Sequence, residues 1–341
     1  MTDASENAAR TTSGTLRAIE PGMLTCVQDL GRRGTGWMGV SPGGAADWYS
    51  ARAANRLVGN DDNAALIETT LSGTSFKISR AAVVAVTGAD APLAIGERVC
   101  EPWVAHAAPA GSMIVVGAAR RGVRSYIALD GGVIVPALFG SASTDVTSGF
   151  GGRILQRGDE LDLGPEAANA RLLVGQRRSA LRLPTDASLR VLAGLDERLT
   201  PALVANTYTV SARSSRQALM LDGGRTGSTV APPDVVSFGV TAGCVQIASD
   251  GSPMVLLVEH QTTGGYAVAA CVIHADLPIA AQLRAGARVR FSMVSMEVSE
   301  TALMERINAL AGIDDPLNGD PVRDDGFAER LMHGFFEGVE V

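Results

Sequence analysis

Short apolar runs alternate with turn signals along most of the chain. The runs at residues 81–87 and 254–258 are almost wholly apolar, which is typical of strands buried on both faces. In residues 161–163 and 289–291 the apolar positions alternate with polar ones, which is typical of half-buried strands. Further strands are predicted at residues 113–117 and 125–129. This pattern predicts a mainly β protein with antiparallel barrel or sandwich closure, and not a series of regular βαβ units.

Helical periodicity is confined to a few segments. In residues 45–58 the apolar side chains recur at helical spacing, and Gly59 supplies a stop signal. Asp47 stands at the start of that segment, where the positive end of the helix dipole favours a carboxylate. Shorter helices are predicted at residues 197–205, 299–311 and 327–336. The fold class that we expect is therefore mainly β with a few helices.

The distribution of these elements predicts two β domains. Residues 15–165 are expected to form an N-terminal β-barrel-like domain, and residues 188–298 a C-terminal β-barrel domain. Residues 166–187, which are rich in Ala and Arg and poor in strand alternation, are the expected linker. Residues 1–14 are polar and predict a disordered tail, and residues 299–341 predict a helical C-terminal extension.

The composition argues against several classes of protein. Hydrophobic residues make up 46% of the 341 residues and charged residues 19%, which is ordinary for a soluble globular protein. The 29 Lys and Arg residues against 36 Asp and Glu residues give a net charge of −7, and no basic run is present, so nucleic acid is not an expected partner. No apolar run approaches the roughly 20 residues of a membrane helix, and no secretory signal is recognisable. We expect a cytoplasmic protein without a membrane partner.

The cysteines and histidines show no spacing typical of metal ligands. Cys26, Cys100, Cys244 and Cys271 are far apart in the sequence and have apolar neighbours. Buried thiols in a reducing compartment are therefore expected. The four histidines are equally scattered, so no metal site is predicted.

The densest polar cluster comes directly after the apolar run at residues 254–258. Residues 259–266 read Glu-His-Gln-Thr-Thr-Gly-Gly-Tyr. The Gln and Thr side chains offer donors and acceptors without a strong acid, base or nucleophile, and the glycines allow a ligand to approach closely, which suits an uncharged amide, lactam or urea. Gln261 and Thr263 are the catalytic candidates in this cluster. The candidates for substrate binding are Thr262, Gly264, Gly265 and Tyr266. A hairpin with a polar turn is the alternative interpretation.

A second polar cluster lies in a glycine-rich segment nearer the N-terminus. Asp29 and Arg32 are three residues apart, close enough to pair or to share an anionic ligand, and they are the catalytic candidates here. Gln28 and Asp47 are candidates for substrate binding. The structural alternatives are a turn clamp between Asp29 and Arg32 and a helix N-terminal carboxylate at Asp47.

Other motifs carry weaker signals. Asp90 follows a strongly apolar strand and is a further candidate for substrate binding, with a plain turn as the alternative. Glu68 lies in an apolar stretch and, if buried, needs a partner or a raised pKa. Residues 39–43 match the Gly-x-Ser-x-Gly pattern of nucleophile elbows, but Pro42 has no N–H to serve as an oxyanion donor. The sequence contains no P-loop motif, so ATP would not bind through one.

Several segments, taken together and in order, resemble the allophanate hydrolase subunit 2 family. This family is also described as biotin-dependent carboxyltransferase or KipA-like, and it includes a subunit of 5-oxoprolinase. The resemblance extends over about residues 16–291. The matching stretches, which are specific in combination, include Val27-Gln-Asp-Leu-Gly-Arg32, Thr87-Gly-Ala-Asp90 and Gln261-Thr-Thr-Gly-Gly-Tyr266.

The resemblance implies two cyclophilin-like β-barrel domains and a partner chain of the subunit 1, or KipI-like, type. It implies a role in an ATP-dependent 5-oxoprolinase that converts 5-oxoproline to glutamate, with a third, hydrolase subunit as a further partner. ATP would be bound in the complex by this chain or by a partner, and this chain alone would be inactive. The alternatives are the carboxyltransferase part of a urea carboxylase, with biotin on a separate chain, and a non-catalytic regulator that binds a kinase inhibitor.

The chain departs from the family pattern at several positions. The substituted residues are Gly43, Ala46, Ser215, Ala218 and Ala267. Ser215 stands where the family often has an aspartate, so an expected carboxylate partner of Arg216 is missing.

Overall fold

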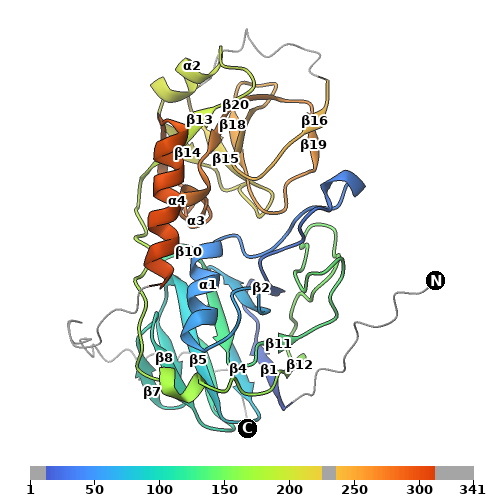
Figure 1. Ribbon diagram of the computed structural model, residues 1–341, viewed down its shortest axis with the longest axis vertical. Coiled ribbons are helices and arrows are strands. Elements are labelled where there is room, and N and C mark those ends of the chain that lie inside the picture. Colours follow the sequence, from blue (N-terminus) through green and yellow to red (C-terminus); the bar gives the residue numbers. More distant parts are fainter. Residues whose placement is uncertain (1–12, 225–235, 312–341) are drawn as a thin grey trace.

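The computed structural model describes residues 13–224 and 236–311. Most of the expected N-terminal tail and the helix predicted at residues 327–336 lie outside the described residues. Within the described residues the protein is mainly β with a few helices, which confirms the predicted fold class. The chain forms two halves that lie one above the other in Figure 1.

Two sheets make up the first half, drawn from blue to green in Figure 1. The seven-stranded sheet has the order β11 (Val133–Ile134), β12 (Glu160–Leu163), β1 (Gly14–Glu20), β4 (Thr74–Ile78), β9 (Met113–Val116), β6 (Leu93–Ile95) and β7 (Arg98–Cys100). The five-stranded sheet has the order β2 (Leu24–Gln28), β3 (Leu66–Thr70), β10 (Arg121–Leu129), β5 (Ala82–Asp90) and β8 (Ala105–Ala108). Both sheets contribute to one apolar core, in which Leu16 and Phe76 lie with Ile67 and Ile127.

A closed barrel forms the second half. Its strands follow the order β13 (Ala187–Ala193), β20 (Ala267–Val272), β17 (Cys244–Ile247), β18 (Pro253–Leu256), β15 (Ala218–Asp222), β14 (Tyr208–Val210) and β21 (Arg288–Met293). The parallel pairing of β13 with β21, in which Leu189 lies opposite Phe291, completes the ring. A two-stranded ribbon of β16 (Phe238–Gly239) and β19 (Thr263–Gly264) accompanies the barrel.

Four helices and three 3-10 turns accompany the sheets within the described residues. They are α1 (Trp48–Leu57), α2 (Thr200–Ala205), α3 (Leu277–Ala280) and α4 (Met296–Ala311), with the 3-10 turns η1 (Gly36–Met38), η2 (Ala170–Leu173) and η3 (His274–Asp276). As predicted, Asp47 caps α1, because its carboxylate accepts a hydrogen bond from the Ser50 N–H at 2.9 Å. In Figure 1, α4 runs from the barrel to α1. There Leu310 of α4 packs with Trp48 and Tyr49.

The cysteines follow the expectation with one exception. Cys26, Cys100 and Cys244 are buried, but Cys271 is only partly buried. Side chains alternate between the faces of a strand, so Val272 points into the barrel core while Cys271 points away from it. Among the described residues no helix is long and apolar enough to span a membrane.

Candidate active site

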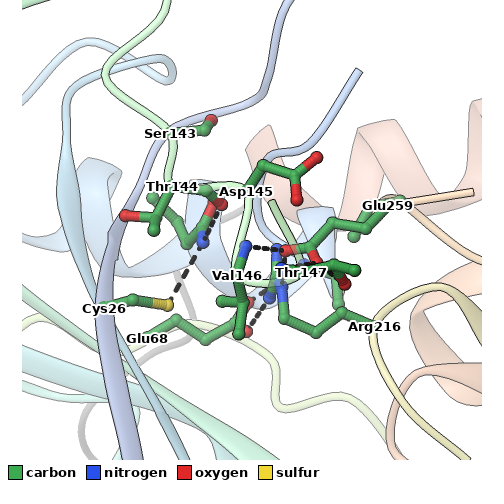
Figure 2. A network of polar contacts seen from close by, with 12 residues as sticks. Cys26, Glu68, Ser143, Thr144, Asp145, Val146, Thr147, Arg216 and Glu259 are labelled. Carbon is green, nitrogen blue, oxygen red and sulfur yellow. Dashed lines mark hydrogen bonds and ion pairs between the residues drawn. The ribbon is translucent and has the colours of Figure 1, made fainter. Parts of the chain in front are cut away.

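A buried arginine joins the two halves of the chain (Figure 2). Arg216, two residues before β15, donates through Nε to Glu259 at 2.5 Å and through Nη1 to Glu68 on β3. Its Nη2 donates to the Gly44 carbonyl at 2.5 Å. Ser215 supplies no carboxylate to Arg216, and two carboxylates distant in the sequence, Glu68 and Glu259, take that role instead.

Glu68 is the partner that the first half supplies. Its Oε2 accepts a hydrogen bond from the Ala46 N–H at 3.0 Å, and Arg124 Nε lies 3.7 Å from Oε1. Burial alone would raise the pKa of Glu68, but Arg216 and Arg124 outweigh burial and hold the pKa below its ordinary value. Burial likewise opposes the charge of Arg216, yet the nearby Glu68 and Glu259 raise its pKa. Glu68 and Arg216 are therefore both charged at neutral pH.

Glu259 extends this network to a loop of the first half. Its carboxylate accepts hydrogen bonds from the N–H groups of Val146 at 3.1 Å and Thr147 at 3.4 Å, and from the Thr147 hydroxyl at 3.2 Å. The preceding residue, Asp145, accepts the Ser148 N–H at 3.0 Å through Oδ1. In Figure 2 the Asp145 carboxylate points away from the Arg216 network. Glu259 from the barrel half thus holds the loop that carries the Asp145 carboxylate at the boundary of the two halves.

A polar cleft of about 260 Å³ opens beside this loop. Both halves of the chain line it. The lining residues are Gly39, Val40, Ser41, Asp145, Thr147, Ser148, Phe150, Gln217, Glu259, His260 and Gln261. Carboxylate, hydroxyl, amide and imidazole groups therefore converge on one small space, as expected of a site for a small polar molecule.

His260 is the group in this cleft best suited to proton transfer. Its Nδ1 lies 2.6 Å from the Gln261 carbonyl oxygen, so Nδ1 carries the proton in the neutral ring and Nε2 is left as an acceptor. Burial lowers the pKa of His260, so the ring is neutral at neutral pH. The sequence placed Glu259 and His260 at the start of the polar cluster at residues 259–266, but neither was chosen as a site candidate. Their position at the end of an apolar run was the available signal.

The predicted recognition residues after His260 divide between the cleft and a small ribbon. Gln261 lines the cleft, and its amide Nε2 donates to the buried Gln246 Oε1 at 3.0 Å. Thr263 and Gly264 form β19, and the Thr262 carbonyl accepts a hydrogen bond from Val240 at 3.1 Å. The two remaining candidates, Gly265 and Tyr266, are exposed. The segment connects β18 to β20, which do not pair with each other, and its β19 pairs with β16, so it is not the hairpin of the alternative interpretation. Gln261 is its member that lines the cleft.

Asp29 and Arg32 lie away from the cleft lining and hold a loop together. Asp29 Oδ1 accepts hydrogen bonds from the Gly31 N–H and the Ser141 hydroxyl, both at 2.7 Å, and from the Ser143 hydroxyl at 2.5 Å. Its Oδ2 accepts the Ala142 N–H at 2.7 Å. Arg32 donates to the Ser143 carbonyl, and burial lowers its pKa. These contacts favour a structural role for both residues, but among the described residues Asp29 and Arg32 do not pair with each other, so the predicted clamp between them is not observed.

The other predicted binding residues occupy three different places. Gln28 donates to the Thr144 carbonyl at 2.9 Å beneath the loop that carries Asp145. Asp47 accepts the Gln282 amide at 2.8 Å as well as capping α1, and burial raises the pKa of Asp47. Asp90 lines a separate cavity of about 790 Å³. The structure does not bring these three side chains to the cleft lining.

The contacts of Asp29 lead to a test of its role. The isosteric change Asp29→Asn places an amide donor among groups that already donate, so we expect the free energy of unfolding to fall by about 1–3 kcal/mol. Urea denaturation of the purified chain measures this change. The exposed Asp90→Asn is the control, expected within about 0.5 kcal/mol of the wild type. An Asp29→Asn chain of unchanged stability that abolishes activity in the complex would restore the catalytic assignment.

The chain belongs to the carboxyltransferase family, whose model, described as "Carboxyltransferase domain, subdomain A and B", matches residues 38–293. Among its relatives, a 5-oxoprolinase subunit of Escherichia coli is 34% identical over 294 residues, which cover 83% of this chain and 92% of that protein. The Haemophilus influenzae protein of the same name is 31% identical with the same coverage. Urea amidolyase of Lachancea kluyveri is 28% identical over 86% of this chain, but only 18% of that protein is covered.

Solved structures agree with this assignment. The crystal structure of TTHA0988 superimposes with a TM-score of 0.75 at 32% identity, covering 82% of this chain and 56% of that chain. The K. lactis urea amidolyase superimposes with a TM-score of 0.78 at 25% identity, covering 92% of this chain and 21% of that chain. The family resemblance inferred from the sequence is confirmed.

Proposed function

We propose that this chain is a subunit of a hetero-oligomeric, ATP-dependent 5-oxoprolinase that hydrolyses the cyclic amide of 5-oxoproline to glutamate. The observation that carries the proposal is the 34% identity to a 5-oxoprolinase subunit of Escherichia coli along 92% of that protein. The cleft between the halves supports it, because a small lactam needs amide and hydroxyl partners and a neutral base. Its partners in the complex are proposed to be a subunit 1 type chain and a hydrolase chain.

The chemistry assigned to this chain is binding and proton transfer. In such a reaction ATP phosphorylates the lactam oxygen and leaves as ADP, water adds at the lactam carbon as the ring C–N bond breaks, and a second water releases phosphate from the resulting acyl phosphate. Gln261, which lines the cleft, is proposed to hydrogen-bond the substrate amide, and His260 Nε2 to accept a proton from water. ATP is proposed as a cosubstrate of the complex, held largely by partner chains because this sequence has no P-loop motif.

The proposal is tested by reconstitution. The purified chain is expected to show no ATP-dependent formation of glutamate from 5-oxoproline, because it contributes only part of the site. Addition of the subunit 1 type and hydrolase chains from the same host should produce that activity. Omission of this chain from the mixture is the control and should remove it. Turnover by this chain alone, or full activity without it, would contradict the proposal.

A second candidate function is carboxyl transfer to urea from biotin carried on another chain. The observation in its favour is the similarity to urea amidolyases over 86% of this chain. Affinity purification from the native host followed by an avidin blot separates the two candidates. A biotinylated partner would favour carboxyl transfer, and a hydrolase chain without biotin would favour 5-oxoprolinase.

A further inference from the structure

A second cavity of about 260 Å³ adjoins the polar cleft, and His260 lines both. The two halves of the chain again supply its walls. The lining residues with polar or aromatic side chains are Arg33, Trp48, Arg52, Thr241, His260 and His274. The remaining lining residues are apolar or glycine, and no acidic side chain is among the described residues that line it.

The positive charge of Arg52 is poorly neutralised by its neighbours. Its guanidinium carbon lies 5.3 Å from the centre of the Trp48 ring, and its buried Nε has no hydrogen-bond partner among the described residues. The nearest carboxylate, Asp62, is 4.0 Å from that nitrogen. Asp62 is already bound in a fork by Arg56, at 2.6 and 2.8 Å. Burial lowers the pKa of Arg52, and Arg56 and Arg33 lower it further against the attraction of Asp62. A negative ligand would relieve this imbalance.

Arg33 and His274 complete the polar part of the cavity. Arg33 is exposed, and no ion-pair partner for it occurs among the residues that the structure describes. The His274 ring stacks on Trp48 with centroids 5.1 Å apart and planes at 8°. Partial desolvation lowers the pKa of His274, and the charges of Arg52 and Arg33 add to that effect. The cavity therefore presents two guanidinium groups and the neutral rings of His260 and His274, and its net charge is positive.

We propose that this cavity is an anion subsite that binds the carboxylate or phosphate group of a small ligand whose uncharged part lies in the cleft beyond His260. Resting on the proposed function, the ligand is 5-oxoproline, which combines a neutral lactam with one carboxylate. A phosphate of the nucleotide is the other source of the same chemistry. Arg33 and Arg52 bind the anion, and their arrangement selects anionic over neutral lactams.

Titration calorimetry at low salt on the purified full chain tests the inference. The probes are 5-oxoproline, inorganic phosphate and 2-pyrrolidinone, which has the lactam ring without the carboxylate. The variants are Arg33→Gln and Arg52→Gln, the latter keeping an aliphatic stem over Trp48. Arg198→Gln is the matched control, because it removes one exposed charge that pairs with Asp196 and lies outside both cavities. Thermal melting of each variant verifies that it is folded.

Arg33→Gln and Arg52→Gln are each expected to weaken binding of the anionic probe by about tenfold or more, because each removes one charge-assisted contact. The control Arg198→Gln is expected to bind that probe as the wild type does. If the variants weaken binding of 5-oxoproline but not of inorganic phosphate, the anion is the carboxylate. If the variants weaken binding of inorganic phosphate but not of 5-oxoproline, the anion is a phosphate group. Failure of both anions to bind the wild type, or equal binding by the wild type and both variants, overturns the inference.

Kinetic measurements on the reconstituted complex test the anion subsite and the proposed function independently. If the reconstituted complex hydrolyses 5-oxoproline and both variants keep the wild-type KM for 5-oxoproline and for ATP, the anion subsite is wrong and the function stands. If the variants lose anion binding but the complex never turns over 5-oxoproline, the subsite stands and the function is wrong.

Discussion

Replacing Arg216 by methionine is expected to lower the free energy of unfolding by about 3–5 kcal/mol. The change leaves Glu68 and Glu259 as buried carboxylates without their shared cation, and it also removes the donor to the Gly44 carbonyl. Because methionine fills a similar volume, the loss of stability comes from the missing charge and hydrogen bonds more than from a cavity. Urea denaturation at neutral pH measures it.

The stability deficit of Arg216→Met is also expected to depend on pH. In the wild type the pKa of Glu68 lies below its ordinary value of 4.5, so its stabilising contribution is complete above that value and disappears as pH falls through the folded pKa. Without the charge of Arg216, the effect of burial on Glu68 is opposed less and the pKa of Glu68 is higher, so its protonation relieves the variant at acid pH. The deficit should therefore be largest at neutral pH and smaller near pH 5. A deficit below about 1 kcal/mol, or one that does not change with pH, would contradict this account.

Arg213→Met is the matched control for Arg216→Met. The Arg213 side chain is largely exposed, and it pairs with the exposed Asp222 at 3.2 Å. Exposed ion pairs contribute little, so we expect a change of at most about 0.5 kcal/mol. Similar losses in both arginine variants would show that burial of the network does not matter.

The change His260→Gln is expected to lower kcat of the reconstituted complex by about 10²–10⁴-fold, the usual contribution of a general base. Glutamine retains hydrogen bonding but cannot accept a proton at neutral pH. Initial rates of ATP-dependent glutamate formation measure the loss, and gel filtration verifies that the complex forms. His106→Gln is the control, because His106 also has a lowered pKa and bonds a backbone carbonyl but lies outside the cleft.

The wild-type pH profile provides a second measurement on His260. A base must be neutral to act, and burial lowers the pKa of His260 from 6.5. Activity should therefore rise with pH through a midpoint below 6.5 and stay constant at neutral pH, with that acid limb absent in His260→Gln. A variant that keeps the wild-type kcat and acid limb would exclude His260 as the base.

Local features of the sequence predicted much of the fold. The strand predicted at residues 81–87 lies within β5 (Ala82–Asp90) apart from its first residue, and Asp47 caps α1 as expected. The helix predicted at residues 299–311 begins earlier, at Met296. These elements were predictable because periodicity and capping depend on residues close together in the chain.

The candidate site was predicted less well, for a physical reason. Of the polar residues singled out as site candidates, Gln261 lines the cleft, whereas Asp29 is occupied with loop contacts. Asp29 and Arg32 stand out in the sequence because they lie among glycines, but a loop also needs such side chains to satisfy its backbone. Their residue types do not distinguish the two roles.

The sequence by itself determined the family, the β character of the chain and the polar segment that enters the site, since short motifs and alternation are local properties. Only the tertiary structure decided which charges meet. Glu68 and Arg216 are 148 positions apart, and Arg216 and Glu259 are 43 apart. Packing of the barrel against the first half buries these three side chains together, and in that low-dielectric environment each requires the others. The same packing creates the cleft, because neither half supplies all of its walls.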